Sequence, residues 1–140
     1  MESLGILTVN RRCYLASIAL ARGIAITIEH PRSSWAWKLP EIVRFMQSHG
    51  LRWFPVDWCM FTSGARPQKP TRLLSSMVWL PGVLKVCDGG HSHEPLGLSM
   101  GSRLKAIGAY PEHFCRALAQ ACIRWYGCAA SAPPKPAGCL

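Results

Sequence analysis

Apolar positions along the 140-residue chain fall alternately into helical and β-type patterns. Helical spacing predicts helices over Val9–Arg22, Leu39–His49 and Pro111–Tyr126. Runs rich in β-branched and aromatic residues predict strands over Ile24–Ile28, Leu51–Cys59 and Thr71–Ser76, the last of which also fits an antiparallel strand. Strands that alternate with helices indicate an α/β layer structure with at least one right-handed βαβ unit.

The run Ile24–Ile28 is continuously apolar and β-branched rather than alternating. Such runs are typical of strands covered on both faces, as in parallel sheets. Pro31 cannot donate to a ladder, so we expect this strand to end near Glu29 and His30. We therefore expect a small, three-layer-like α/β domain with a short, mostly parallel sheet over residues 1–127. A flexible Pro/Ala-rich tail would follow over residues 128–140.

Polar side chains at the strand ends are the first candidate site. In open α/β sheets, ligands bind outside the carboxyl ends of the strands. If the strands ending near Glu29 and Asp57 are parallel neighbours, these two carboxylates face one crevice and are candidate catalytic residues. Candidate substrate-binding residues next to them are His30, Pro31, Ser33 and Ser34. The structural alternative is that Glu29 caps the following turn and Asp57 pairs with a nearby arginine.

Positive charge predominates, with 16 Lys and Arg against 7 Asp and Glu, a formal net charge of +9. This balance favours polyanionic partners, nucleic acid first and an anionic membrane surface second. Arg66, Lys69 and Arg72 lie on a proline-containing loop and are candidate phosphate contacts. The alternative is an ordinary solvated charged loop. No apolar run reaches the roughly 18 residues that a membrane span needs.

Cysteine and histidine residues suggest a metal site. In an extended segment His91 and His93 point the same way, and with Cys87 they offer three zinc ligands. Candidates for a fourth ligand are Cys59, His113 and Cys115. The alternative is a polar loop whose glycines allow tight turns. The 7 cysteines are odd in number and scattered, which favours a reducing, intracellular location in the nucleus or cytoplasm.

Five segments, taken in order, resemble a known domain. They are EHP from Glu29, with the serines and tryptophan after it, DxCMF from Asp57, QKPTR from Gln68, CxGxHxH from Cys87 and AYPxxxCRALA from Ala109. Together they resemble a domain of retroelement-type and polyprotein-like sequences of protists and fungi. That domain is similar to the C-terminal half of class I S-adenosylmethionine-dependent methyltransferases. The resemblance covers Gly23–Trp125.

The resemblance implies a truncated Rossmann-like methyltransferase fold with S-adenosylmethionine as cofactor. Glu29 and Pro31 would match the motif that holds the target amino group, although His30 stands where the family has Asn or Pro. A strand and glycine loop for the cofactor do not precede this motif, which implies a copy that is inactive alone. Our first expectation is therefore a nucleic-acid-associated, methyltransferase-like remnant of a mobile element. The alternative is a zinc-stabilised module that binds nucleic acid or protein.

Overall fold

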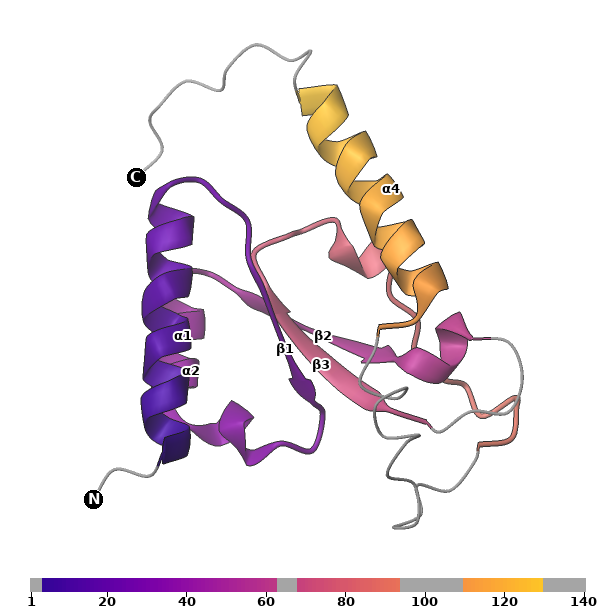
Figure 1. Ribbon diagram of the computed structural model, residues 1–140, viewed down its shortest axis with the longest axis horizontal. Coiled ribbons are helices and arrows are strands. Elements are labelled where there is room, and N and C mark those ends of the chain that lie inside the picture. The colour runs from indigo at the N-terminus through magenta and orange to yellow at the C-terminus, as the bar shows by residue number, and fades with distance from the viewer. Residues whose placement is uncertain (1–3, 63–67, 94–109, 130–140) are drawn as a thin grey trace.

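A three-stranded antiparallel sheet with helices on both faces forms the centre of the molecule in the computed structural model (Figure 1). The structure describes residues 4–62, 68–93 and 110–129. The strands are β1 (Thr27–Pro31), β2 (Arg52–Asp57) and β3 (Pro70–Ser75). The helices are α1 (Leu4–Ala21), α2 (Pro40–Ser48) and α4 (Glu112–Ala129), with short 3-10 turns η1 (Trp35–Lys38), η2 (Trp58–Phe61) and η3 (Leu80–Gly82).

The sheet order is β1-β3-β2, and β3 pairs antiparallel with both of its neighbours. The α/β class is therefore confirmed, but the mostly parallel sheet and the truncated Rossmann-like fold are wrong. β1 and β2 do run in the same direction, since both oppose β3, but β3 is inserted between them. The chain after η2 turns back and fills the position that a parallel neighbour would take. The continuous apolar run Ile24–Ile28 predicted neither strand direction nor burial correctly, since none of its residues is fully buried.

Both outer strands contain a proline, which explains a second difference from the sequence prediction. β1 runs on to Pro31 instead of ending before it, and β2 includes Pro55. Proline is tolerated on edge strands because its missing N–H faces away from the ladder. The central strand β3 has proline only as its first residue, Pro70. β1 is thus an edge strand, and Ile24, which was expected inside it, lies before it and is 55% exposed.

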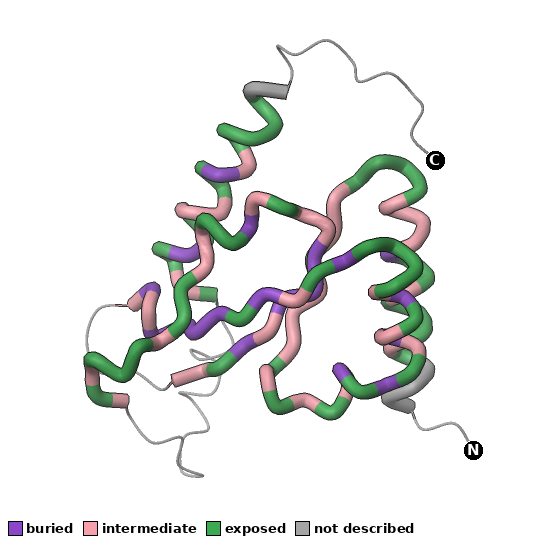
Figure 2. The backbone as a smooth tube through the Cα atoms, turned by 180° about the vertical axis from the view of Figure 1, so that it is seen from behind, coloured by how far each residue is buried: buried purple, intermediate pink, exposed green. Residues whose placement is uncertain are grey.

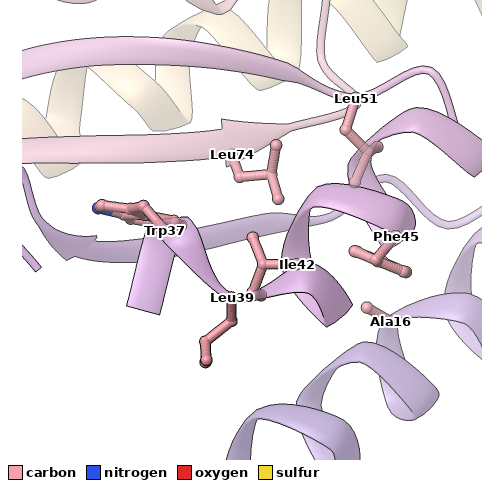
Figure 3. Packing of buried hydrophobic residues seen from close by; sticks show 7 residues of the cluster. All are labelled: Ala16, Trp37, Leu39, Ile42, Phe45, Leu51 and Leu74. Atoms are coloured by element: carbon pink, nitrogen blue, oxygen red, sulfur yellow. The ribbon is translucent and has the colours of Figure 1, made fainter. Parts of the chain in front are cut away.

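The α1/α2 face of the sheet carries a cluster of buried apolar side chains (Figure 3). Leu74 of β3 is fully buried there, and Trp37 meets Trp53 edge-on at 4.7 Å between ring centroids. α1 contributes Ala16 and α2 contributes Ile42. Burial of each large aliphatic side chain contributes about 1.5–3 kcal/mol, so this face supplies much of the stability of the fold.

The α4 face of the sheet is covered less completely (Figure 2). Phe54, Val56 and Leu73 point from the sheet toward Phe114, close to the start of α4. The later turns of α4 are largely exposed, and Ile123 keeps 70% of its accessible surface. The helix was predicted to end at Tyr126, but it continues to Ala129. Most of the predicted tail, residues 130–140, lies outside the described residues.

Candidate metal centre

Four potential metal ligands lie together beyond the end of β2. One ligand atom from each of them is within 4.8 Å of the other three, and the residues are Cys59, Cys87, His91 and His93. Three of these residues are the metal ligands expected from the sequence, and Cys59 is one of the three candidates for the fourth. The other two candidates line separate pockets, His113 in one and Cys115 in the other. The cluster offers the ligand set that a metal ion needs.

The segment 87–93 folds back on the sulfur of Cys87. Gly89 has φ +80°, a conformation that favours glycine, and its N–H points at Cys87 Sγ at 3.4 Å. The N–H of Gly90 donates to Asp88 Oδ1 at 2.9 Å, and such hydrogen bonds lower the pKa of the Asp88 carboxyl. The turn brings the Nε2 atoms of His91 and His93 to 3.8 and 3.4 Å from Cys87 Sγ.

Cys59 contributes the buried side of the cluster. It lies in η2, directly after β2, and is 5% exposed. Burial contributes most to raising the pKa of the Cys59 thiol to about 11. A hydrogen bond to Cys87, the negative charge of Cys87 and the charge of Asp57 make smaller contributions in the same direction. The raised pKa favours the protonated thiol. A bound dication would favour the thiolate instead, because a thiol that coordinates a metal ion is deprotonated. Cys13, Cys59, Cys87, Cys115 and Cys122 are free thiols.

Asp57 connects the strand ends to the metal cluster. It is only 1% exposed, yet both carboxylate oxygens have donors. Arg32 Nη2 donates to Oδ1 at 2.9 Å, and the Cys87 N–H donates to Oδ2 at 2.9 Å. The Asp57 N–H in turn donates to the Lys85 carbonyl at 2.9 Å. The arginine pair foreseen as the structural alternative is the arrangement found, and Asp57 anchors the segment that carries Cys87.

Glu29 and His30 lie on opposite faces of the sheet, because successive side chains of a strand alternate. Glu29 lines a pocket beneath α4. His30 packs edge-on against Trp37, with 5.8 Å between ring centroids, and its buried Nδ1 has no hydrogen-bond partner in the part of the chain that the structure describes. The predicted crevice shared by Glu29 and Asp57 required β1 and β2 to be neighbouring strands. That expectation is wrong, because β3 lies between them.

The remaining residues expected to bind substrate shape the turn after β1. The Pro31 carbonyl accepts a hydrogen bond from Trp37 Nε1 at 2.9 Å. Ser34 caps η1, since its Oγ accepts from the Ala36 N–H at 3.2 Å, and Ser33 is exposed. These contacts hold the turn against the α1/α2 face of the sheet.

The residues expected to contact nucleic acid are described only in part. Arg66 lies outside the described residues. The guanidinium of Arg72 lies over the Trp53 ring, 5.6 Å from its centroid. The backbone carbonyl of Lys69 accepts from the Trp58 N–H at 3.5 Å. The described part of the loop is therefore tied to the sheet and to η2.

A basic pocket that no sequence pattern predicts lies beside the metal cluster. This pocket, of about 510 Å³, is lined by Lys85, His113 and Arg124 together with apolar and neutral residues of η2 and α4. Lys85 lies two positions before Cys87, whereas the other two basic residues come from α4. No local motif joins them, so only the packing of α4 brings them together.

Comparisons with protein-family models, with curated proteins and with solved structures found no match. The resemblance to a retroelement-associated, methyltransferase-like domain therefore stays a prediction. Across residues 4–62, 68–93 and 110–129, no helix is both long and apolar enough to cross a bilayer.

Proposed function

We propose that this protein is a zinc-stabilised nucleic-acid-binding module. The observation that carries the proposal is the convergence of Cys59, Cys87, His91 and His93, with one ligand atom of each within 4.8 Å of the others. Two thiolates and two imidazoles are a common ligand set of structural zinc sites.

Two of the spacings within the cluster match those of a tetrahedral zinc ion, and all four ligand atoms lie within 4.8 Å of one another. Zn–S bonds of about 2.3 Å and Zn–N bonds of about 2.0–2.1 Å place tetrahedral ligand atoms roughly 3.3–3.8 Å apart. Cys87 Sγ lies 3.4 Å from His93 Nε2 and 3.8 Å from His91 Nε2, which is within this range. The N–H of Gly89 also points at this sulfur and would stabilise its thiolate form.

A closed set of four protein ligands favours a structural role for the metal over a catalytic one. Catalytic zinc keeps a position open for water or substrate, and four protein ligands fill the tetrahedron. Zinc would join the segment 87–93 to η2, and Asp57 already holds the same segment through the Cys87 N–H. The metal would thus fix the surface around Lys85 relative to the sheet.

The basic pocket supports the nucleic-acid part of the proposal. Lys85, His113 and Arg124 line it, and no acidic residue is among its described lining residues. The Lys85 ammonium also lies over the Phe61 ring, 5.7 Å from its centroid, which holds the cation at the pocket wall. Cations gathered in one hollow, in a chain of net charge +9, are suited to contact phosphate groups.

Zinc content tests the first part of the proposal. The full chain, purified without chelator, should contain one zinc per chain by elemental analysis. Cys87→Ser should lose most of it, while Cys115→Ser, a substitution at an exposed free thiol outside the cluster, should retain it. Zinc well below one per chain in the unsubstituted protein would contradict the proposal.

Salt-dependent binding tests the second part. Fluorescence anisotropy with labelled single-stranded and duplex DNA should show affinity that falls as salt rises, because bound counterions are released. Arg124→Ala should weaken binding to all sequences and reduce the salt slope by about one. Lys38→Ala, at an exposed position in η1, is the matched control and should change little. No binding, or binding insensitive to salt, would overturn this part.

The methyltransferase-like interpretation is not part of the proposal. It rested on the resemblance of five sequence segments and stays a prediction, while the Rossmann-like fold that the resemblance implied is wrong because the sheet is antiparallel. S-adenosylmethionine as cofactor has no other support in the described residues. An origin in a mobile element and a location in the nucleus or cytoplasm stay predictions from the sequence.

A further inference from the structure

A second pocket, of about 410 Å³, lies between the sheet and helix α4. Leu73 of β3 forms part of its wall, and the other side is formed by Phe114 and Leu118 of α4. Its volume falls within the range of about 300–1,000 Å³ that is typical of small-molecule sites. None of the residues proposed above as zinc ligands or phosphate contacts lines it. The pocket is therefore independent of the proposed function.

One carboxylate lies in this mostly apolar wall. Glu29 of β1 is paired with Leu73 in the sheet register and lines the pocket with it. Glu29 Oε1 is buried and has no hydrogen-bond partner among the described residues. The neighbouring hydroxyl of Thr27 is already engaged with Ser75 Oγ at 2.8 Å. A buried acceptor without a donor is rare in proteins, since its lost hydration is not replaced.

Tyr110 lies at the same carboxylate and still leaves Oε1 without a partner. Partial burial raises the pKa of the Tyr110 phenol, and the negative charge of Glu29 and a hydrogen bond to Glu29 raise it further. No lysine, arginine or histidine is among the described residues that line the pocket. The carboxylate therefore has a neutral neighbour in Tyr110 but no positive partner in the pocket wall.

We propose that this pocket binds a small molecule that has an apolar body and a protonated amine. The ammonium group donates to Glu29 Oε1, and the apolar body packs against Leu73, Leu80 and Phe114. A charged N–H group supplies both the missing donor and the missing counter-charge, whereas an alcohol supplies only the donor. An anionic ligand of the same shape is repelled by Glu29.

A matched set of three probes tests the charge requirement. 2-Phenylethylamine, 2-phenylethanol and phenylacetate have similar apolar bodies and carry a positive, a neutral and a negative group. Binding to the full, metal-loaded chain is followed by chemical-shift changes in ¹⁵N-labelled protein. The amine should bind about tenfold or more tightly than the alcohol, because a hydrogen bond to a charged group is worth this much, and phenylacetate should bind weakest.

Substitutions locate the site. Glu29→Gln should remove the preference for the amine over the alcohol, while Glu41→Gln, on the α2 side of the sheet, should leave it unchanged. Ala119→Phe fills the pocket and should abolish binding of the amine and the alcohol alike. Ala117→Phe is its matched control, because Ala117 lines the basic pocket instead. Both phenylalanine variants should keep the zinc content and the circular dichroism of the unsubstituted chain.

Three outcomes would overturn the inference. They are no binding of the amine at millimolar concentration, equal affinity for amine and alcohol, and an amine preference that survives Glu29→Gln. A change of sedimentation coefficient in Ala119→Phe without any amine binding would show that the pocket is instead covered by a second copy of the chain. Each of these results leaves the zinc and nucleic-acid measurements unaffected, so the two proposals fail separately.

Discussion

Asp57 and Glu29 are acidic side chains on the two outer strands of one small sheet, and their surroundings differ. Asp57 is almost fully buried and has a donor on each oxygen, one from Arg32 and one from the Cys87 backbone. Glu29 lines a mostly apolar pocket, and its buried Oε1 has no donor within residues 4–62, 68–93 and 110–129. Asp57 stabilises the fold through hydrogen bonds to both of its oxygens, whereas Glu29 Oε1 lacks a hydrogen bond among the described residues.

The difference shows what distinguishes a structural carboxylate from a candidate binding group. Both residues follow apolar positions near a strand end, and the sequence pattern treats them alike. The partners come from distant parts of the chain, Arg32 and Cys87 for Asp57 and Tyr110 for Glu29. Substitutions at the two positions should therefore have opposite effects on stability.

The largest effect is expected for Asp57→Ala. The substitution leaves Arg32 without its counter-charge and the Cys87 N–H without its acceptor. Breaking a buried ion pair by removing one partner costs about 3–5 kcal/mol, and the partial exposure of Arg32 places the expected loss at the lower end. Urea unfolding of the zinc-loaded chain measures this loss.

Asp57→Asn is the matched control. Its side-chain oxygen can still accept from Cys87, so it should lose less stability than Asp57→Ala. Zinc affinity should also fall in Asp57→Ala, because the segment that carries Cys87 loses its anchor. If both variants unfold at the same urea concentration as the unsubstituted chain, the anchoring role of Asp57 is wrong.

A smaller change of opposite sign is expected for Glu29→Met. A thioether of similar length fills the apolar pocket without an unpaired oxygen, so the free energy of unfolding should rise by about 1 kcal/mol. Urea unfolding under the same conditions gives the comparison. A loss of more than about 1 kcal/mol would mean that the contact between Glu29 and Tyr110 stabilises the fold by more than the unpaired oxygen costs, which contradicts the prediction.

The smallest effect is expected in the titration of Tyr110. Burial and Glu29 raise the pKa of its phenol, so the folded chain keeps this proton at a pH where an unfolded tyrosine, with a pKa of about 10, has lost it. The stabilisation is therefore fully present below about pH 10 and is lost as the pH rises through the folded pKa. The difference in ultraviolet titration between the chain and Tyr110→Phe isolates this group.

Titration of Tyr110 in the Glu29→Gln variant separates the effect of the Glu29 charge on the pKa from the effect of burial. The substitution removes the negative charge, so the pKa of Tyr110 should move back toward its ordinary value while part of the increase, due to burial, remains. An unchanged titration of Tyr110 in Glu29→Gln would contradict the placement of the two side chains together.

Local patterns in the sequence found the order of the helices and strands but not all of their bounds, since α1 begins at Leu4 instead of Val9 and β1 begins at Thr27 instead of Ile24. The helix of Pro40–Ser48 and the strand of Pro70–Ser75 lie within a residue or two of their predicted bounds. Strand direction could not be predicted, because the parallel sheet was inferred from the apolar run Ile24–Ile28, and most of that run lies before the edge strand β1. The end of β1 was predicted wrongly because proline is excluded from central strands but tolerated in edge strands, and β1 is an edge strand that includes Pro31.

The metal cluster was foreseeable in part and the pockets were not. Cys87, His91 and His93 lie within one short segment, so their convergence follows from local geometry. Cys59 could be named only as one of three candidates, because its approach depends on how β2 and the segment after η3 pack. Glu29 and Tyr110 are separated by most of the chain, and no periodic pattern joins them.

Titration of the metal-free chain with Co²⁺ tests the central claim most directly, because the visible spectrum reports both geometry and ligand type. Tetrahedral coordination by two thiolates and two imidazoles should give strong visible bands, with a sulfur-to-cobalt charge-transfer band, that saturate at one Co²⁺ per chain. Zinc should bleach these bands, and Cys59→Ser should weaken them. A weak, octahedral-type spectrum without a charge-transfer band would show that Cys59, Cys87, His91 and His93 do not form a metal centre.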